Sequence, residues 1–178
     1  SSTGYLECTS GALRVAHDSV FEIGSSELCD INVRFVVDTV TGNYEAIAAS
    51  GSNVGNTNRG WIITLDNTNK IRFRASSNGT SWDIADVTLS ATAVTAGSEY
   101  VVSARRKSTN SWEIMLNGEV TNTFTSSSAI YNGSAGLSIG AQSDGTHVAN
   151  PFTGRVKFFR LTVGGYRIPL DLSPISAL

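Results

Sequence analysis

Short stretches in which apolar and polar residues alternate recur about every 8 to 15 residues, a spacing typical of strands in all-β domains. The clearest stretch covers residues 31–37, where Ile31, Val33, Phe35 and Val37 occupy every second position. Side chains of a strand alternate between its two faces, so this period predicts a half-buried strand. No segment longer than a turn has the 3.6-residue apolar period of a helix, and the pattern therefore predicts an all-β protein.

Two turns between predicted strands have a clear chemical signature. Apolar residues again occupy every second position in residues 61–65 and 71–73. The segment 66–69 between these stretches is Asp-Asn-Thr-Asn. Asn and Asp tolerate positive φ and bond to their own backbone, so this segment predicts a hairpin turn. The dipeptide Asn117-Gly118 predicts a second hairpin with a type I′ turn.

The remaining strands and the domain limits are expected as follows. Residues 5–9 and 13–17 are predicted to form an opening pair, and the Thr-rich segment 120–125 is predicted to lie at a sheet edge. No internal repeat or linker interrupts the chain, so residues 1–170 are expected to form one domain. Residues 171–178 are expected to be a C-terminal tail or the start of a linker.

Alternation also predicts which side chains fill the core. Trp61 and Trp112 alternate with Ile and Leu and are expected inside. The other residues predicted to point between two sheets are Phe35, Ile63, Leu65, Phe73, Val102, Ile114, Leu116, Ile139 and Phe158.

The composition favours an exposed setting. Of the 178 residues, 40% are hydrophobic, enough for a core, but only 16% are charged, against roughly 25% in an average domain. Ser, Thr, Asn and Gly supply the polarity instead, which is typical of an extracellular or virion surface. No apolar run approaches the length of a membrane span, so membrane insertion is not expected.

Charge and cysteine usage exclude some functions. The net charge is −2, and the one basic cluster, Arg105, Arg106 and Lys107, is interpreted as a solvated hairpin end. Nucleic-acid binding needs a broader basic surface and is not expected. Cys8 and Cys29 are interpreted as unpaired, half-buried thiols rather than as a disulfide.

Several segments resemble a known family. They are the Leu-Arg-Val-Ala-His-Asp-Ser-Val-Phe-Glu-Ile-Gly run at 13–24, the central hairpin at 60–73, and Pro-Phe-Thr-Gly-Arg-Val-Lys-Phe-Phe-Arg-Leu at 151–161. Over about residues 5–163 the chain is similar to the laminin-G-like, concanavalin A-like lectin/glucanase superfamily. The resemblance implies a two-sheet antiparallel jelly roll, a fold that mostly binds glycans or other proteins. The Ser/Thr/Asn-rich style also resembles domains of tailed-phage virion proteins.

The family includes glycoside hydrolases, so the spacing of the carboxylates bears on whether the chain can be catalytic. A retaining glycosidase needs two carboxyl groups about 5 Å apart on one face. Glu27 and Asp30, and likewise Asp83 and Asp86, are three residues apart and would point to opposite faces of a strand. A non-catalytic protein is therefore expected, with a degenerate glycoside hydrolase relative as an alternative.

The candidate binding residues lie in two predicted rim loops. Trp82 follows a polar turn and is the ring most expected to be exposed, where an indole can stack on a sugar. The loop 141–150 contributes Asp144, His147 and Asn150, whose side chains suit sugar hydroxyls. No cofactor is expected, although Asp144 is a weak calcium candidate. A plain solvated loop is the alternative interpretation of this segment.

The sequence thus predicts a non-catalytic recognition or adhesion module that binds a glycan or a protein surface through rim loops. It is expected to belong to a phage virion or another extracellular assembly. The alternative is a purely structural decoration domain whose partners are capsid or tail proteins.

Overall fold

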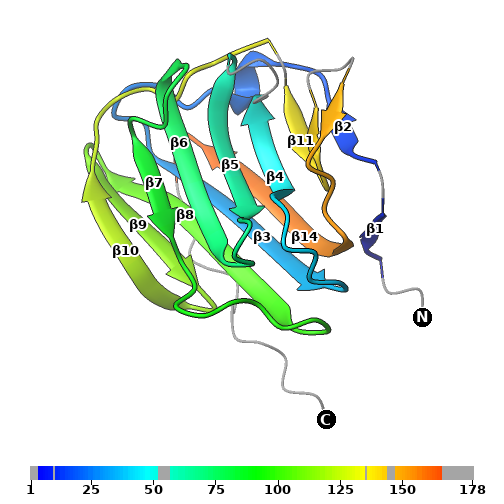
Figure 1. The fold of residues 1–178 in the computed structure, drawn as a ribbon. Helices are drawn as coiled ribbons and strands as arrows, with labels where there is room; N and C mark the ends of the chain where they lie inside the picture. Colours follow the sequence, from blue (N-terminus) through cyan, green and yellow to red (C-terminus); the bar gives the residue numbers. More distant parts are fainter. Residues whose placement is uncertain (1–3, 10, 52–56, 135, 144–146, 166–178) are drawn as a thin grey trace.

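The computed structural model describes residues 4–9, 11–51, 57–134, 136–143 and 147–165, and these form two six-stranded sheets packed face to face (Figure 1). All pairings between neighbouring strands are antiparallel. The only helical segment in the described part of the chain is the 3₁₀ turn η1 (Ser19–Phe21). Among the described residues, no helix is long and apolar enough to cross a membrane.

Sheet A contains the chain's longest strands. Its order is β1 (Leu6–Cys8), β14 (Gly154–Val163), β3 (Cys29–Val37), β8 (Glu99–Ser108), β9 (Ser111–Leu116) and β10 (Glu119–Thr125). The Thr-rich β10 is an edge strand, as predicted. At the β9–β10 turn Asn117 and Gly118 both have positive φ, 52° and 87°, which is the backbone of the predicted type I′ turn.

Sheet B is the second layer of the sandwich. Its order is β2 (Leu13–Val15), β11 (Leu137–Ile139), β4 (Glu45–Gly51), β5 (Arg59–Leu65), β6 (Ile71–Gly79) and β7 (Ala85–Thr88). A separate hairpin of β12 (Gln142–Ser143) and β13 (Val148–Ala149) follows β11.

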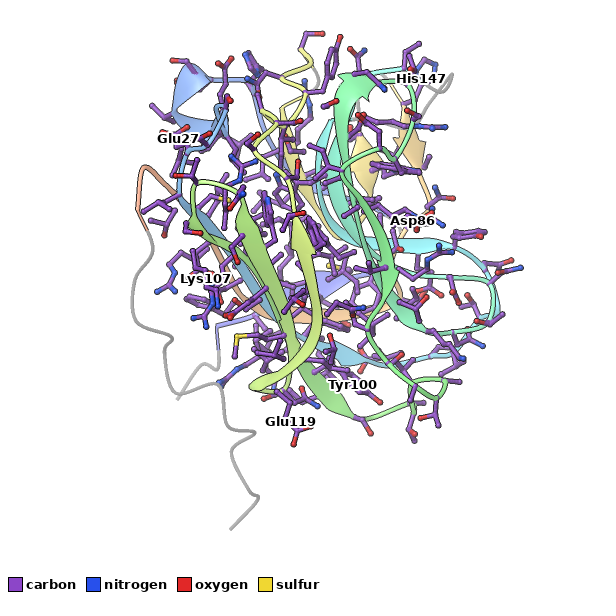
Figure 2. The ribbon with its side chains drawn as sticks, turned by 90° about the vertical axis from the view of Figure 1, so that its left-hand side faces the viewer. Glu27, Asp86, Tyr100, Lys107, Glu119 and His147 are labelled. Atoms are coloured by element: carbon purple, nitrogen blue, oxygen red, sulfur yellow. The ribbon has the colours of Figure 1, made fainter. Side chains whose placement is uncertain are left out.

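The core lies between the two sheets, where side chains fill the interior (Figure 2). Trp61 and Trp112 are buried as predicted, and eight of the nine other predicted core residues belong to the core or pack against it. Phe73 of sheet B faces Trp112 of sheet A with ring centroids 6.4 Å apart. Contacts of this kind join the two layers.

Phe158 is the exception among the predicted core residues. The pairing of β14 with β3 shifts between Val156 and Phe158, so the alternation changes phase at this bulge. Phe159 therefore points inward and stacks on Trp61 at 6.2 Å, whereas Phe158 pairs with the outward-facing Arg34. The strict period-2 assignment of Phe158 to the core was wrong.

The predicted opening pair was also wrong. Residues 6–8 pair with β14 in sheet A, and residues 13–15 pair with β11 in sheet B. A pair of three-residue strands would form few contacts on its own. Each strand instead adds to one of the two large sheets as its outermost strand. The chain consequently crosses from one sheet to the other between Cys8 and Leu13.

The Phe-x-Gly step before β14 has a steric explanation. A Cβ on Gly154 would lie 2.2 Å from the carbonyl oxygen of Val36 and 2.4 Å from the ring of Phe152. Phe152 itself meets Phe35 edge to face, with centroids 5.7 Å apart. Only glycine lets this ring pass under the strand and reach the core.

The basic cluster is not the solvated hairpin end that was expected. Arg106 is fully buried, and its guanidinium lies 4.7 Å from the ring centroid of Trp112. Arg105 and Lys107 instead pair with Glu113 on the neighbouring strand β9. Strand alternation separates Arg106 from its neighbours, because it pairs with the inward-facing Cys29 in the register of β3 and β8.

Both cysteines are free, as predicted, but they are fully rather than half buried. Burial raises the pKa of the Cys29 thiol from 9.0 to about 11. The folded protein then holds this proton above about pH 9, where an unfolded chain releases it.

Ionisation of Cys29 should therefore leave the free energy of unfolding unchanged below about pH 9 and lower it between about pH 9 and 11. The expected loss is about 2–3 kcal/mol, since one pKa unit corresponds to about 1.4 kcal/mol. Urea unfolding of the wild type and of Cys29→Ala across this range checks it. Their stabilities should converge as pH rises, because the variant lacks the titrating thiol, and parallel curves would contradict the assignment.

Candidate functional site

A hollow of about 300 Å³ lies on the outer face of sheet B, the face turned away from the core. This volume falls at the lower end of the roughly 300–1,000 Å³ range of small-molecule sites. Its lining residues are Tyr44, Ile62, Thr64, Arg74, Trp82, Gln142 and Asn150.

The floor of the hollow is formed by Ile62 and Thr64 of strand β5 and by Arg74 of strand β6. Ala46, Ala49 and Ile62 form a small buried cluster here, and Trp82 packs against it. The β12–β13 hairpin provides one wall through Gln142. Trp82, on the connection between β6 and β7, provides the opposite wall.

The guanidinium of Arg74 is held by two aromatic rings. Its Cζ lies 5.5 Å from the ring centroid of Tyr44 and 5.9 Å from that of Trp82. The Trp82 ring also lies 5.2 Å from Cζ of Arg59, whose Nη1 donates to the carbonyl of Thr80. Trp82 is therefore half-buried among cations, rather than the freely exposed ring expected from the sequence.

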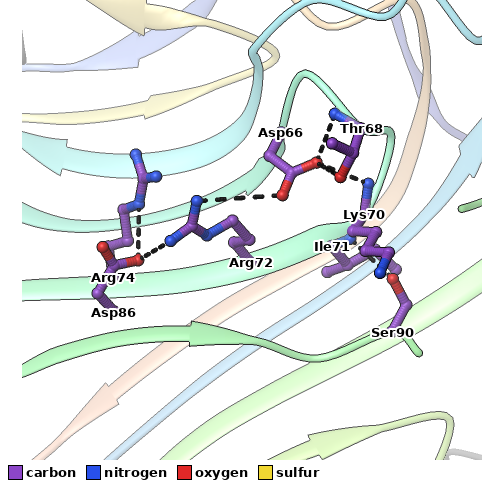
Figure 3. Close-up of polar contacts among 8 residues, drawn as sticks. All are labelled: Asp66, Thr68, Lys70, Ile71, Arg72, Arg74, Asp86 and Ser90. Atoms are coloured by element: carbon purple, nitrogen blue, oxygen red, sulfur yellow. Dashed lines mark hydrogen bonds and ion pairs between the residues drawn. The ribbon is translucent and has the colours of Figure 1, made fainter. Parts of the chain in front are cut away.

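Arg74 also belongs to a charged network along β6 (Figure 3). Its Nε donates to Oδ1 of Asp86 at 3.0 Å, and Arg72 donates to the same oxygen. Arg72 reaches toward Asp66 as well, with Nη1 4.0 Å from Oδ2. Asp86 thus fixes two guanidinium groups on the outer face.

Asp66 organises the turn between β5 and β6. Its Oδ1 accepts hydrogen bonds from the backbone nitrogens of Thr68 and Lys70 and from the Thr68 hydroxyl, at 2.6–3.0 Å (Figure 3). Burial opposes ionisation of this carboxyl, but the hydrogen bonds outweigh it and hold the pKa of Asp66 below its ordinary value. The turn predicted at 66–69 therefore also fixes the start of β6.

Several polar groups in the hollow have unused hydrogen-bonding capacity. The hydroxyl of Thr64, a residue only 4% exposed, has no partner among the described residues. Nδ2 of Asn150 donates to Oε1 of Gln142 at 2.8 Å, and the backbone carbonyl of Asn150 accepts from Ala46 at 2.8 Å. Within the described ranges, neither Asn150 Oδ1 nor Gln142 Nε2 has a further partner, so both remain available to a ligand.

A second hollow, of about 490 Å³, lies on the other side of Tyr44 and Asn150, which line both. Its acidic residue is Glu45, which is 2% exposed. The Glu45 carboxylate accepts from the Thr41 hydroxyl and from the backbone nitrogen of Thr153. The two hollows are adjacent, since they share Tyr44 and Asn150, and together they are called the groove; its first part is basic and aromatic and its second part is acidic.

The structure brings together two of the four residues predicted from the sequence. Trp82 and Asn150 line the same hollow. His147 is exposed directly before β13 and lines neither hollow, and Figure 2 shows it at the upper end of the molecule, well above Asp86. Asp144 lies outside the described residues. No group of three or more potential metal ligands occurs among the residues that the structure describes.

Sequence reasoning missed the residues that complete this hollow, above all Tyr44, Arg74 and Gln142. Arg74 alternates with the core residue Phe73 and so had to face outward, which the period-2 pattern already implied. Tyr44 and Gln142 are distant in sequence from Arg74. Only the register of the sheet and the fold of the β12–β13 hairpin bring them to it.

The sequence profile of the concanavalin A-like lectin/glucanases superfamily, Laminin_G_3, matches residues 13–162. The chain therefore belongs to this superfamily, and the resemblance and the jelly-roll fold expected from it are confirmed. A comparison with curated proteins gave no significant sequence match.

Solved structures show the same fold at low identity. A Bacteroides ovatus protein to which carbohydrate binding has been ascribed has a TM-score of 0.65 at 12% identity, with 88% of this chain and 42% of that one covered. This chain thus spans less than half of that protein. The CBM40 domain of the Ruminococcus gnavus IT-sialidase, bound to α2,3-sialyllactose, has a TM-score of 0.58 at 14% identity, with 91% and 92% covered. The binding domain of botulinum neurotoxin serotype G has 0.63 at 13%, with 95% and 41% covered.

Proposed function

We propose that this protein is a non-catalytic glycan-recognition module whose ligand lies in the groove on the outer face of sheet B. The observation that carries the proposal is the set of groups in that groove. Two aromatic side chains, a guanidinium and unpartnered hydrogen-bonding groups meet over a rigid sheet. The carbohydrate-binding domains that share the fold support a glycan partner.

Sugars present both apolar C–H faces and directional hydroxyl groups, and this groove offers partners for both. Tyr44 and the free edge of Trp82 supply apolar surface. The Thr64 hydroxyl, Asn150 Oδ1 and Gln142 Nε2 supply acceptors and donors that a sugar can satisfy. A buried hydroxyl without a partner is costly, so ligand or solvent must fill that role at Thr64.

The carboxylates near the groove support a non-catalytic role. Asp86 is engaged by two arginines, and Glu45 accepts from Thr41 and Thr153. A glycosidase needs one carboxyl group free to act as an acid and a second as a nucleophile or base. Among the described residues of the groove, both carboxylates are instead held by hydrogen bonds within the protein.

Tyr44→Ala is expected to weaken glycan binding at least about tenfold, because the ring contacts both hollows and helps to hold Arg74. A glycan array followed by calorimetry measures the effect. Tyr5→Ala is a matched control, since Tyr5 is 44% exposed against 41% for Tyr44 and also lies under a guanidinium, that of Arg155 at 5.8 Å. Equal effects of the two variants would rule out this groove as the binding site.

The setting of the protein is a further part of the proposal. A lectin-like domain of this kind suits an extracellular or surface-exposed position, and the virion assembly predicted from composition stays a prediction. Asp144 and His147 stay candidates for additional ligand contacts, with Asp144 the calcium candidate. A decoration domain would instead bind capsid or tail proteins and would give no signal on a glycan array.

A further inference from the structure

We infer that the groove selects acidic saccharides, with the carboxylate of the sugar paired to the terminal nitrogens of Arg74. This inference rests on the proposed glycan-binding function and names the substrate class. It is carried by the way in which the chain holds the Arg74 side chain.

The guanidinium of Arg74 is fixed but only partly used. Nε donates to Asp86 at 3.0 Å, and the rings of Tyr44 and Trp82 lie 5.5 and 5.9 Å from Cζ. Its two terminal nitrogens have no acceptor among the residues that the structure describes, and Figure 3 shows them pointing away from Asp86. An oriented pair of N–H groups is the geometry that binds a carboxylate through two parallel hydrogen bonds.

The neighbouring charges do not already satisfy this group. Oδ1 of Asp86 is shared between Arg72 and Arg74, so one carboxylate serves two guanidinium groups. Asp66, the other nearby acid, uses its Oδ1 for the β5–β6 turn and lies 4.0 Å from Arg72. Arg74 is therefore the guanidinium of this network that is left with donors facing the hollow.

The groove also has an electrostatic direction. The second hollow, beyond Tyr44 and Asn150, contains the buried carboxylate of Glu45. A sugar carboxylate placed there would face a like charge in a poorly solvated site. An acidic saccharide should therefore put its carboxylate at Arg74 and a neutral sugar unit beside Glu45.

Paired probes that differ in charge test the inference. Trigalacturonate and its methyl ester share one backbone, and α2,3-sialyllactose and lactose differ by an acidic sugar. Calorimetry of the wild type should give tighter binding of the acidic member in at least one pair, by about tenfold or more. Arg74→Gln should bring the ratio of the affinities for the acidic and the neutral member close to one. Arg74→Lys should restore only part of this ratio, because lysine keeps the charge but lacks the two parallel N–H donors of the guanidinium.

Arg155→Gln is the matched control, since Arg155 also pairs with a carboxylate, Asp38, and lies over a tyrosine, but on the other sheet. It should leave the ratio unchanged. Binding of the neutral member by Arg74→Gln shows that the variant groove is intact.

The outcomes separate this inference from the proposed function. Binding of neutral glycans only, or an acid preference that survives Arg74→Gln, overturns the acidic-saccharide inference and leaves a glycan-binding groove. Preference for a sulfated chondroitin hexasaccharide over its unsulfated form, without response to the carboxylate pairs, overturns the carboxylate assignment. Absence of binding to any glycan, acidic or neutral, on the array overturns both.

Discussion

Replacing Arg106 with methionine is expected to destabilise the protein by about 3–5 kcal/mol. The guanidinium donates from Nη1 to the carbonyls of Gly24 and Glu27, at 2.8 and 3.2 Å, and from Nη2 to the carbonyl of Ser128. It thereby ties β8 to the segment before β3 and to the segment after β10. Methionine can fill much of the space over Trp112, but it removes the Arg106 donors to all three carbonyls, of which Gly24 keeps only the longer bond from the Glu27 backbone nitrogen at 3.3 Å.

Urea unfolding measures this effect, and Lys107→Met is the control in the next position of the chain. Lys107 is 44% exposed and pairs with Glu113 at the surface, so its loss should cost no more than about 1 kcal/mol. Similar costs at the two positions would mean that Arg106 is as solvated as the sequence suggested. That result would contradict the burial of Arg106 on the inner face of β8.

The second large effect is expected at Phe73, where replacement by alanine should cost about 3–5 kcal/mol. The ring is fully buried and meets Trp112 of the opposite sheet, so the variant leaves a cavity between the layers. Phe158→Ala is the matched control, because Phe158 lies beyond the β14 bulge on the outer face.

Chemical denaturation of both variants should show Phe158→Ala losing less than half as much stability as Phe73→Ala. Equal losses would place Phe158 in the core and contradict the bulge between Val156 and Phe158 in β14. A small loss at Phe73 would instead contradict the packing of the two sheets.

The fold was predictable because alternation is a strong signal wherever a strand has one buried face. The strands around Phe35, Ile63 and Phe73 followed it, and so did the Asn117-Gly118 turn. The signal failed at Phe158, because a bulge adds one residue to a strand without any mark in its hydrophobic pattern.

Arg106 shows a second kind of failure. A run of three basic residues suggests a solvated segment, yet a strand turns every second side chain inward. The middle arginine finds three carbonyls and an indole there, which no local pattern reveals. Two of these carbonyls are about 80 residues away in the sequence, with separations of 79 to Glu27 and 82 to Gly24, and the third, of Ser128, is 22 residues away.

The candidate site was predictable in part for the same reason. Trp82 and Asn150 were found because polar loops at the rim of a sandwich are the usual carriers of binding groups. Tyr44 and Arg74 were not, because their meeting depends on the register of β4, β5 and β6. The groove therefore lies partly on a strand face, whereas the sequence pattern predicts binding groups in the rim loops alone.

The central claim, that a glycan binds over the outer face of sheet B, is tested most directly by the indole N–H signals of the three tryptophans in an NMR titration. Trp61 and Trp112 are buried between the sheets, and Trp82 alone lines the groove. Titration with the oligosaccharide that binds most tightly on the array should shift the Trp82 signal, saturate with the calorimetric affinity, and leave the other two in place. Binding that leaves the Trp82 signal unmoved would contradict the claim.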